Sequence, residues 1–415
     1  MKKNIFILTA MAALMLSGCA NTPAKDNSKD NSSDNNGTAD AGTVVDIAGE
    51  EGKSALKASL LATKHAYESL DLTSLGVKST TSEGKLNLKA SYEVEEMGKM
   101  SAEIDAKNLG GVLEAKMAKA QDNTLAASVE VKDTTGSLTL KGSFPSAEEE
   151  GKNVDFTSSL SLAGFKAAAY LSGDTVYADV SDSSVAALVA GVDKFAEDTV
   201  NGLVGTVLDG MAQYYLADFP FFDVETNEFY FTEMFNGMLP ESKKIAVQME
   251  EAVPFPTMSE ASDDDLEGLD EFVTSISEMG AAFGLSFKTF KDGGFAFDVN
   301  LGAEQLIALV STFVTDPDAE GSTAYADIIN SILSEFSIKA SAKFSKGALL
   351  ESIEASCAVA AALTEETATA LIGTPLELSL ALGGKEKVEI SYNNVSVNLP
   401  SDLESYQPIA LGVED

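Results

Sequence analysis

The stretch from Lys85 to Val94 reads KLNLKASYEV, and its residues alternate strictly between polar and apolar. Every even-numbered residue from Leu86 to Val94 is apolar, whereas every odd-numbered residue is polar or charged. Successive side chains of a β-strand point to opposite faces of a sheet. The pattern therefore predicts a strand with one apolar face and one polar face.

The same alternation recurs along the following eighty residues. It covers Met100–Ile104, Leu113–Met117, Leu125–Val131, Leu138–Leu140, Val154–Leu162 and Phe165–Leu171. Three short breaks rich in turn-forming residues separate these runs, namely Leu109-Gly110-Gly111, Gln121-Asp122-Asn123 and Ser172-Gly173-Asp174. Short alternating runs with turn signals between them predict an antiparallel meander.

Helical periodicity precedes and follows this meander. We expect a first helix over Lys53–Leu70, and two apolar stripes at helical spacing over Val185–Phe195 and Leu203–Met211. Phe219–Met258 contains four prolines, which predicts short pieces, and an acidic helix is expected over Asp263–Met279.

The remainder of the chain returns to strands. We expect strands over Phe283–Phe287, Phe295–Val299, Phe336–Phe344, Leu349–Ala361, Leu376–Leu382, Val388–Tyr392 and Val395–Leu399, with turns at Asp292-Gly293-Gly294 and Gly383-Gly384. Two helices are expected among them, over Glu304–Val314 and Tyr325–Leu333. The sequence therefore predicts an α+β fold with a large antiparallel sheet.

Two segments are similar to each other. Tyr170–Val180 and Phe290–Val299 both read as hairpins of aromatic and apolar strands that lead into an amphipathic helix. Residues 44–415 are one α+β ectodomain in this interpretation, with a helical acidic insertion around residues 182–282. A duplication into two similar halves and convergence on a common connection both explain the similarity.

The charge of the chain restricts its partners. The formal net charge is −37, and the sequence contains no arginine. Because nucleic-acid affinity depends on neutralising phosphates, we expect no nucleic-acid partner. Residues 174–278 hold 23 acidic residues and only three lysines. This acidic quarter is read either as a solvated face or as a surface for a cationic protein partner or divalent cations.

No motif for catalysis or cofactor binding was found. The only histidine, His65, excludes a cluster of histidine ligands, and Cys357 lies in an alternating run as a buried structural cysteine. Asp263 and Gly268 have the spacing of a calcium loop, but Thr274 stands where a bidentate glutamate is needed. We therefore expect no enzyme activity, no catalytic residue, no metal site and no cofactor.

The first nineteen residues carry a specific motif. Lys2 and Lys3 precede an apolar segment that is too short to span a bilayer, and Leu16-Ser17-Gly18-Cys19 follows. This segment resembles the signal peptide and lipobox of bacterial lipoproteins. The resemblance implies removal of residues 1–18 and attachment of a diacylglycerol to the thiol of Cys19. The alternative is an ordinary signal peptide with an incidental cysteine.

Residues 19–43 read as a polar tether, because they contain almost no apolar side chains and are rich in Asn, Asp and Ser. With the lipobox, they imply an extracytoplasmic protein whose membrane partner is reached through the lipid on Cys19. The anchoring membrane is the cell membrane, or the outer membrane in a diderm. The sequence leaves the host type and the oligomeric state open.

The order of helix, meander, helices and strands over residues 53–400 resembles the LolA/LolB-like and LppX-like lipoprotein carriers. This resemblance implies a curved, half-barrel-like sheet with helices packed on its apolar concave face, which would bind a hydrophobic, lipid-like ligand. Small side chains on the apolar face leave room for one. The candidate ligand face comprises Ala90, Tyr92, Ala127, Ala340, Ala355 and Cys357. The alternative is a cell-surface structural or interaction lipoprotein with a filled core.

Overall fold

The computed structural model describes residues 42–94, 97–216, 222–223, 228–256, 268–280, 284–314, 327 and 329–409. The expected signal peptide, the lipid attachment at Cys19 and the tether up to residue 41 lie outside the described residues. So do residues 257–267, which include the beginning of the expected acidic helix and the first five positions of the weak calcium motif.

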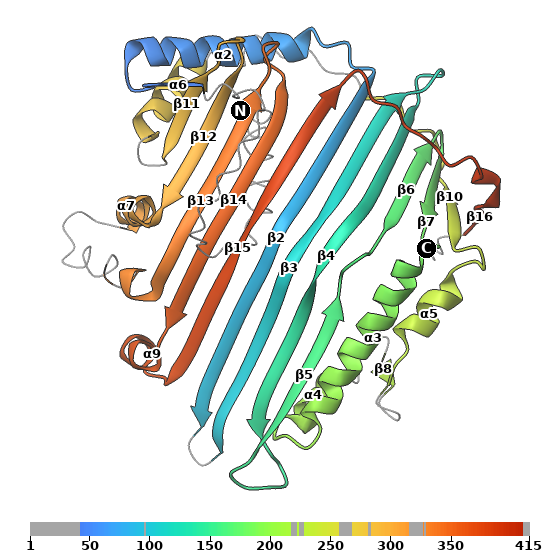
Figure 1. Ribbon diagram of the computed structural model, residues 1–415, viewed down its shortest axis with the longest axis vertical. Helices are drawn as coiled ribbons and strands as arrows, with labels where there is room; N and C mark the ends of the chain where they lie inside the picture. The colour runs from blue at the N-terminus through green and yellow to red at the C-terminus, as the bar shows by residue number, and fades with distance from the viewer. Residues whose placement is uncertain are drawn as a thin grey trace, which may run out of the picture. The chain divides into compact units, whose positions relative to one another are not determined.

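The α+β class is confirmed (Figure 1). In the described part of the chain, fourteen strands form one open sheet in the order β1-β11-β12-β13-β14-β15-β2-β3-β4-β6-β7-β10-β16, with β5 paired to β4. Strands β10 and β16 pair in parallel, so the sheet is mixed rather than wholly antiparallel. Strands β8 and β9 pair separately.

The strands have the following bounds: β1 Thr43–Val45, β2 Ser74–Val94, β3 Gly98–Lys119, β4 Leu125–Pro145, β5 Asn153–Ser161, β6 Ala167–Ser172, β7 Thr175–Asp179, β8 Phe222–Asp223, β9 Glu228–Phe229, β10 Lys244–Gln248, β11 Leu285–Thr289, β12 Phe295–Gly302, β13 Leu333–Phe344, β14 Leu350–Leu363, β15 Leu376–Tyr392 and β16 Gln407–Pro408. The helices are α2 Glu50–Glu68, α3 Ser183–Leu203, α4 Asp209–Leu216, α5 Phe231–Met238, α6 Leu269–Met279, α7 Ala303–Val314 and α9 Glu365–Ile372, with a 3₁₀ turn η2 at Leu403–Ser405. None of the described helices combines the length and the apolar character that a membrane span requires.

The chain divides into two compact units. The first contains the described parts of residues 1–72, 257–359 and 382–391. Its core lies where α2 and α6 pack on the β11–β12 hairpin, and Leu56 and Phe287 are completely buried there. Phe295 stacks on Phe344 with ring centroids 4.6 Å apart. Aromatic burial of this kind is a large stabilising contribution for a unit of this size.

The second unit contains the described parts of residues 73–256, 360–381 and 392–415. Its long strands β2, β3 and β4 are joined as antiparallel hairpins, and β4 pairs with β5 along one half and with β6 along the other. Helix α3 packs on β5, where the hydroxyl of Thr199 donates a hydrogen bond to that of Ser158 (2.9 Å). Gly202 allows this close approach, because a Cβ there would lie 2.3 Å from Cβ of Phe156.

Two of the three expected breaks in the meander are turns. Residues 121–123 connect β3 to β4, and Gly173 with Asp174 connects β6 to β7. The expectation of a third turn at Leu109-Gly110-Gly111 is wrong, because these residues lie inside the 22-residue strand β3. The register shifts there, so the local glycines mark a β-bulge instead of a strand end.

Several expectations for the C-terminal third are wrong as well. The expected strands Leu376–Leu382 and Val388–Tyr392 are one strand, β15, and its two central glycines, 383 and 384, are buried strand residues rather than a turn. Val395–Leu399 is not a strand, since the backbone N–H of Val395 donates to the hydroxyl of Ser74 (3.0 Å) instead of to a neighbouring strand.

The helices also differ in detail from the expectation. The second helical stripe, Leu203–Met211, is interrupted, because α3 ends at Leu203 and α4 begins at Asp209. Leu333, the expected end of a helix, begins β13 instead, and most of the residues from 325 to 328 lie outside the described part. Helix α9 stands where only strands were expected, and Thr364 caps it by accepting a hydrogen bond from the Thr367 N–H (3.2 Å).

Candidate functional site

A row of bulges crosses the middle of the sheet in the second unit. The register shifts between Thr81 and Leu86 in β2, and between Lys107 and Val112 in β3 where that strand faces β4. Three residues at this level have positive φ angles, Glu83 (61°), Asn108 (52°) and Asp133 (53°). Because irregularities in adjacent strands align, the sheet is locally distorted along a line rather than at one point.

The bulges keep the apolar side chains on one face. In β2 the apolar residues are odd-numbered up to Ser79, for example Val77, and even-numbered after the bulge, for example Leu88. Without the extra residue, the apolar side chains in one half of β2 would point to the opposite face of the sheet. The apolar face is the one on which α3 packs, because Leu160 of β5 contacts the helix there.

Glycines make the distortion sterically feasible. A Cβ at Gly84 would lie 1.8 Å from Cβ of Leu109, so no larger residue can be accommodated there. Gly136 of β4 has a φ of 107°, which L-residues with side chains rarely adopt. A Cβ at this position would also lie 2.8 Å from Cα of Leu109.

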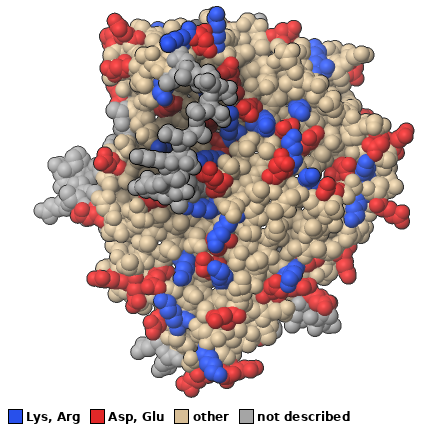
Figure 2. Space-filling model, viewed as in Figure 1, with Lys and Arg blue, Asp and Glu red and all other residues tan. Residues whose placement is uncertain are grey.

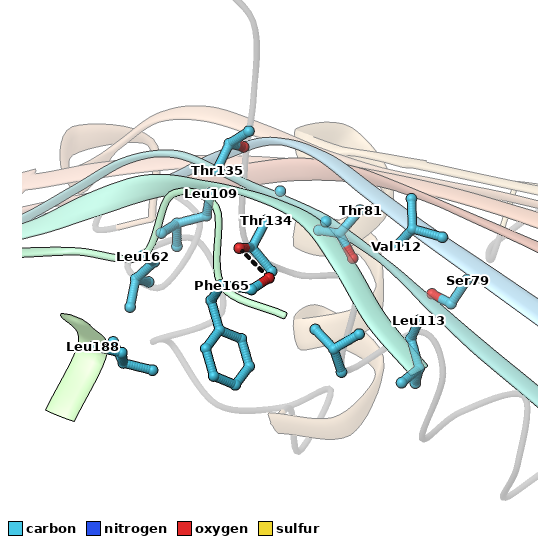
Figure 3. A pocket seen from close by; sticks show the side chains of 13 residues that line it. Ser79, Thr81, Leu109, Val112, Leu113, Thr134, Thr135, Leu162, Phe165 and Leu188 are labelled. Carbon is cyan, nitrogen blue, oxygen red and sulfur yellow. Dashed lines mark hydrogen bonds between the residues drawn. The ribbon is translucent and has the colours of Figure 1, made fainter. Parts of the chain in front are cut away.

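A cavity of about 380 Å³ lies on the apolar face at this level (Figure 3). Its floor is formed by the bulged parts of β2, β3 and β4, and its side by α3 and the loop between β5 and β6. The apolar residues at its boundary are Leu109, Val112, Leu113, Val131, Leu162, Phe165 and Leu188. Figure 3 shows Leu162, Phe165 and Leu188 on the same side of the sheet as Leu113. Cavities of this size and character are typical binding sites for small apolar molecules.

The polar groups of the lining are mostly satisfied within the protein. The hydroxyl of Thr134 donates to the carbonyl oxygen of Phe165 (2.9 Å), and that of Thr135 donates to the carbonyl oxygen of Asn108 (2.7 Å). These bonds hold the β5–β6 loop and the β3 bulge in place. The lining contains no charged side chain. The cavity is therefore better suited to an uncharged than to an ionic ligand.

Part of the apolar face next to the cavity is exposed to solvent. Leu113 is 44% exposed, Val129 43% and Ile104 37%, and all three project from the face on which α3 packs. Because α3 packs chiefly on β5, it leaves the neighbouring strands partly uncovered. An apolar molecule that approaches from solvent would meet this exposed surface next to the cavity.

The opposite face of the same strands is a network of paired charges. Lys132 lies 2.9 Å and Lys116 3.4 Å from the carboxylate of Glu114, and these contacts, with Lys132 the stronger, hold the pKa of Glu114 below its usual value. A hydrogen bond from Asn87 lowers the pKa of Glu103. Figure 2 likewise shows lysines beside acidic side chains on the face in view. These carboxylates are held in the charged form by their partners on this face.

The structure places the sequence-nominated ligand face in two different units. Ala90, Tyr92 and Ala127 belong to the second unit, and none of them lines the cavity. Ala340 and Cys357 are buried in the first unit, with exposed fractions of 8% and 4%, and Ala355 is half-buried there. The nominated set therefore contains none of the residues that line the cavity.

The other chemically interesting side chains do not form a site. His65 is largely exposed and lies 3.2 Å from Glu68 within α2. Among the residues that the structure describes, no group of three or more His, Cys, Asp or Glu side chains is arranged to hold a metal ion. Cys357 is buried, in agreement with its position in an apolar alternating run.

The sequence does not predict the cavity, because the lining residues lie where the alternation of apolar and polar residues is interrupted. The pattern predicts a turn at Leu109, Gly110 and Gly111 and strands at Leu162 and Phe165. The change from odd-numbered to even-numbered apolar residues in β2 was the available signal, since a strand can change parity only through a bulge. Comparison of the chain with protein-family models and with curated proteins finds no match.

Proposed function

We propose that this protein is a membrane-anchored extracytoplasmic lipoprotein that binds a hydrophobic, lipid-like ligand. The observation that carries the proposal is the cavity of about 380 Å³ at the bulges of β2–β4, which is bordered mainly by apolar residues and by no charged one. The partly exposed apolar surface around Leu113 and Val129 supports it, because an apolar ligand would cover that surface.

The anchor is part of the same proposal and comes from the sequence. Leu16-Ser17-Gly18-Cys19 resembles a lipobox, and a lipid on Cys19 would keep the ligand-binding domain at the membrane. Two or more acyl chains give stable anchoring, whereas a single chain is marginal. Metabolic labelling with a tagged fatty acid should mark the parent chain, and Cys19→Ala should abolish the label. A parent chain without the label would contradict lipid anchoring but would leave ligand binding untouched.

Ligand binding is tested by native mass spectrometry and organic extraction of the mature chain carrying Cys19→Ala. We expect a lipid to co-purify, or to bind when a mixture of uncharged lipids such as monoacylglycerols and fatty alcohols is added. Replacement Leu113→Trp should abolish this binding, because the larger ring would occupy the cavity. A chain that remains free of ligand under all these conditions would contradict the proposal and favour an interaction lipoprotein with a filled core.

The matched control is Lys89→Trp. Lys89 is an exposed residue of β2 and lies on the polar face, so its replacement adds the same ring on the other side of the sheet. We expect this variant to bind lipid as the parent chain does. Equal loss in both variants would show that the ring disturbs the sheet and not the cavity.

A further inference from the structure

We infer that the ligand of this cavity is an uncharged hydrocarbon chain carrying a hydroxyl group, which hydrogen-bonds to Thr81. The inference rests on the proposed function and specifies its ligand class. It follows from the absence of charge in the lining and from the hydrogen bonds of its hydroxyl groups.

Charged head groups are disfavoured by the composition of the lining. None of the thirteen lining residues is Lys, Asp, Glu or His, and the chain contains no arginine. A carboxylate, phosphate or ammonium group placed there would lose its hydration without gaining an opposite charge. The formal charge of −37 adds a long-range repulsion of anions.

The hydroxyl of Thr81 differs from the other lining hydroxyls because it makes no hydrogen bond within the described chain. The hydroxyls of Thr134 and Thr135 donate to backbone carbonyl oxygens, and Ser79 also has a partner. The Thr81 hydroxyl can both donate and accept, which is the complement of another hydroxyl group.

The position of Thr81 fits a ligand with its polar end at the cavity mouth. Thr81 is exposed, whereas Phe165, Leu162 and Leu188 are half-buried on the side of α3. Figure 3 shows the oxygen of Thr81 directed to the side of the sheet on which Leu113 and Phe165 lie. A ligand whose hydrocarbon tail packs among these apolar residues would therefore place its hydroxyl group beside Thr81.

The test is a set of probes with one chain length and different head groups. Dodecan-1-ol, dodecanoate and dodecylammonium compete with Nile red for the full mature chain carrying Cys19→Ala. We expect dodecan-1-ol to bind at least about tenfold more tightly than either ion, since burial of an unpaired charge is costly. Monododecanoylglycerol is added to the set to distinguish a free alcohol from a glycerol-linked chain as the source of the hydroxyl. The inference is supported if either the alcohol or the monoacylglycerol binds most tightly.

Replacement Thr81→Val tests the polar contact. It should weaken the binding of dodecan-1-ol by about three- to tenfold relative to Nile red measured in the same variant, as expected for the loss of one hydrogen bond. Thr80→Val is the control, because Thr80 is the adjacent residue of β2 and lies outside the lining. Dodecanoate binding as tightly as the alcohol, or an alcohol affinity insensitive to Thr81→Val, would overturn the inference. If no probe and no Nile red binds, the proposed function itself fails.

Discussion

Tyr406 shows how a single buried polar group affects stability. Its side chain is 6% exposed, and its hydroxyl has no hydrogen-bond partner among the described residues. The ring packs edge-on against Tyr177, with centroids 5.4 Å apart. Burial, and next the negative charge of Asp179, raises the pKa of Tyr406 to about 12.

This raised pKa gives a prediction for alkaline pH. In the unfolded chain a tyrosine ionises near pH 10, so the unfolded state loses its proton first. The contribution of Tyr406 to folding stability should be complete below about pH 10 and decrease as the pH rises towards 12. Urea unfolding at pH 9, 10 and 11 measures this decrease.

The variant Tyr406→Phe separates this residue from the other titrating groups. It should be at least as stable as the parent chain at pH 7, because it removes a buried hydroxyl without a partner. Its stability should also fall less steeply above pH 10. An unchanged alkaline slope would show that another group, such as Tyr170, whose pKa burial also raises, is responsible.

At the scale of the secondary-structure element, the bulges of β2–β4 determine where the cavity forms. They depend on backbone conformations and close approaches that only certain residues allow, as at Gly84 and Gly136. Because three neighbouring strands are irregular at one level, a change in one strand should affect the packing of the next. Substitutions at the bulges should therefore destabilise the protein more than substitutions at regular positions of the same strands.

Gly136→Ala and Gly98→Ala form a matched pair that tests this point. Both glycines have similar φ angles, 107° and 100°, but a Cβ at Gly98 would have no neighbour within 4 Å. We expect Gly98→Ala to cost about 1 kcal/mol from backbone strain, and Gly136→Ala about 3 kcal/mol, because strain and steric overlap add. Denaturant unfolding gives both values. Equal costs would show that strain alone, and not the crowded bulge, restricts position 136.

At the scale of the whole molecule, the dominant electrostatic feature is the net charge of −37. In most ion pairs between described residues at least one partner is exposed, and exposed pairs contribute little individually. Repulsion among the excess carboxylates should therefore oppose folding more than the pairs support it.

Salt should consequently stabilise this protein. Raising the ionic strength from about 0.01 M to about 0.5 M shortens the screening length from about 30 Å to less than 10 Å. We expect the Tm to rise over this range, as measured by calorimetry with sodium chloride. Potassium chloride serves as the control for a specific effect of sodium. A Tm that falls with added salt would show that local ion pairs outweigh the repulsion.

The α+β class, the antiparallel hairpins and the separation of an apolar from a polar face are predictable from the amino-acid sequence. The reason is that alternation with period two is a local property of each strand. The sequence also carries the lipobox-like segment with Cys19, which lies outside the described residues.

Three features are visible only in the folded chain. Gly110 and Gly111 continue a strand, the bulges of three strands align, and α3 leaves part of the apolar face open. These features depend on pairing between residues distant in the chain, and a glycine has the same local signature in a turn and in a bulge. For the same reason, the nominated ligand face lay on alternating residues, whereas the cavity formed where the alternation changes.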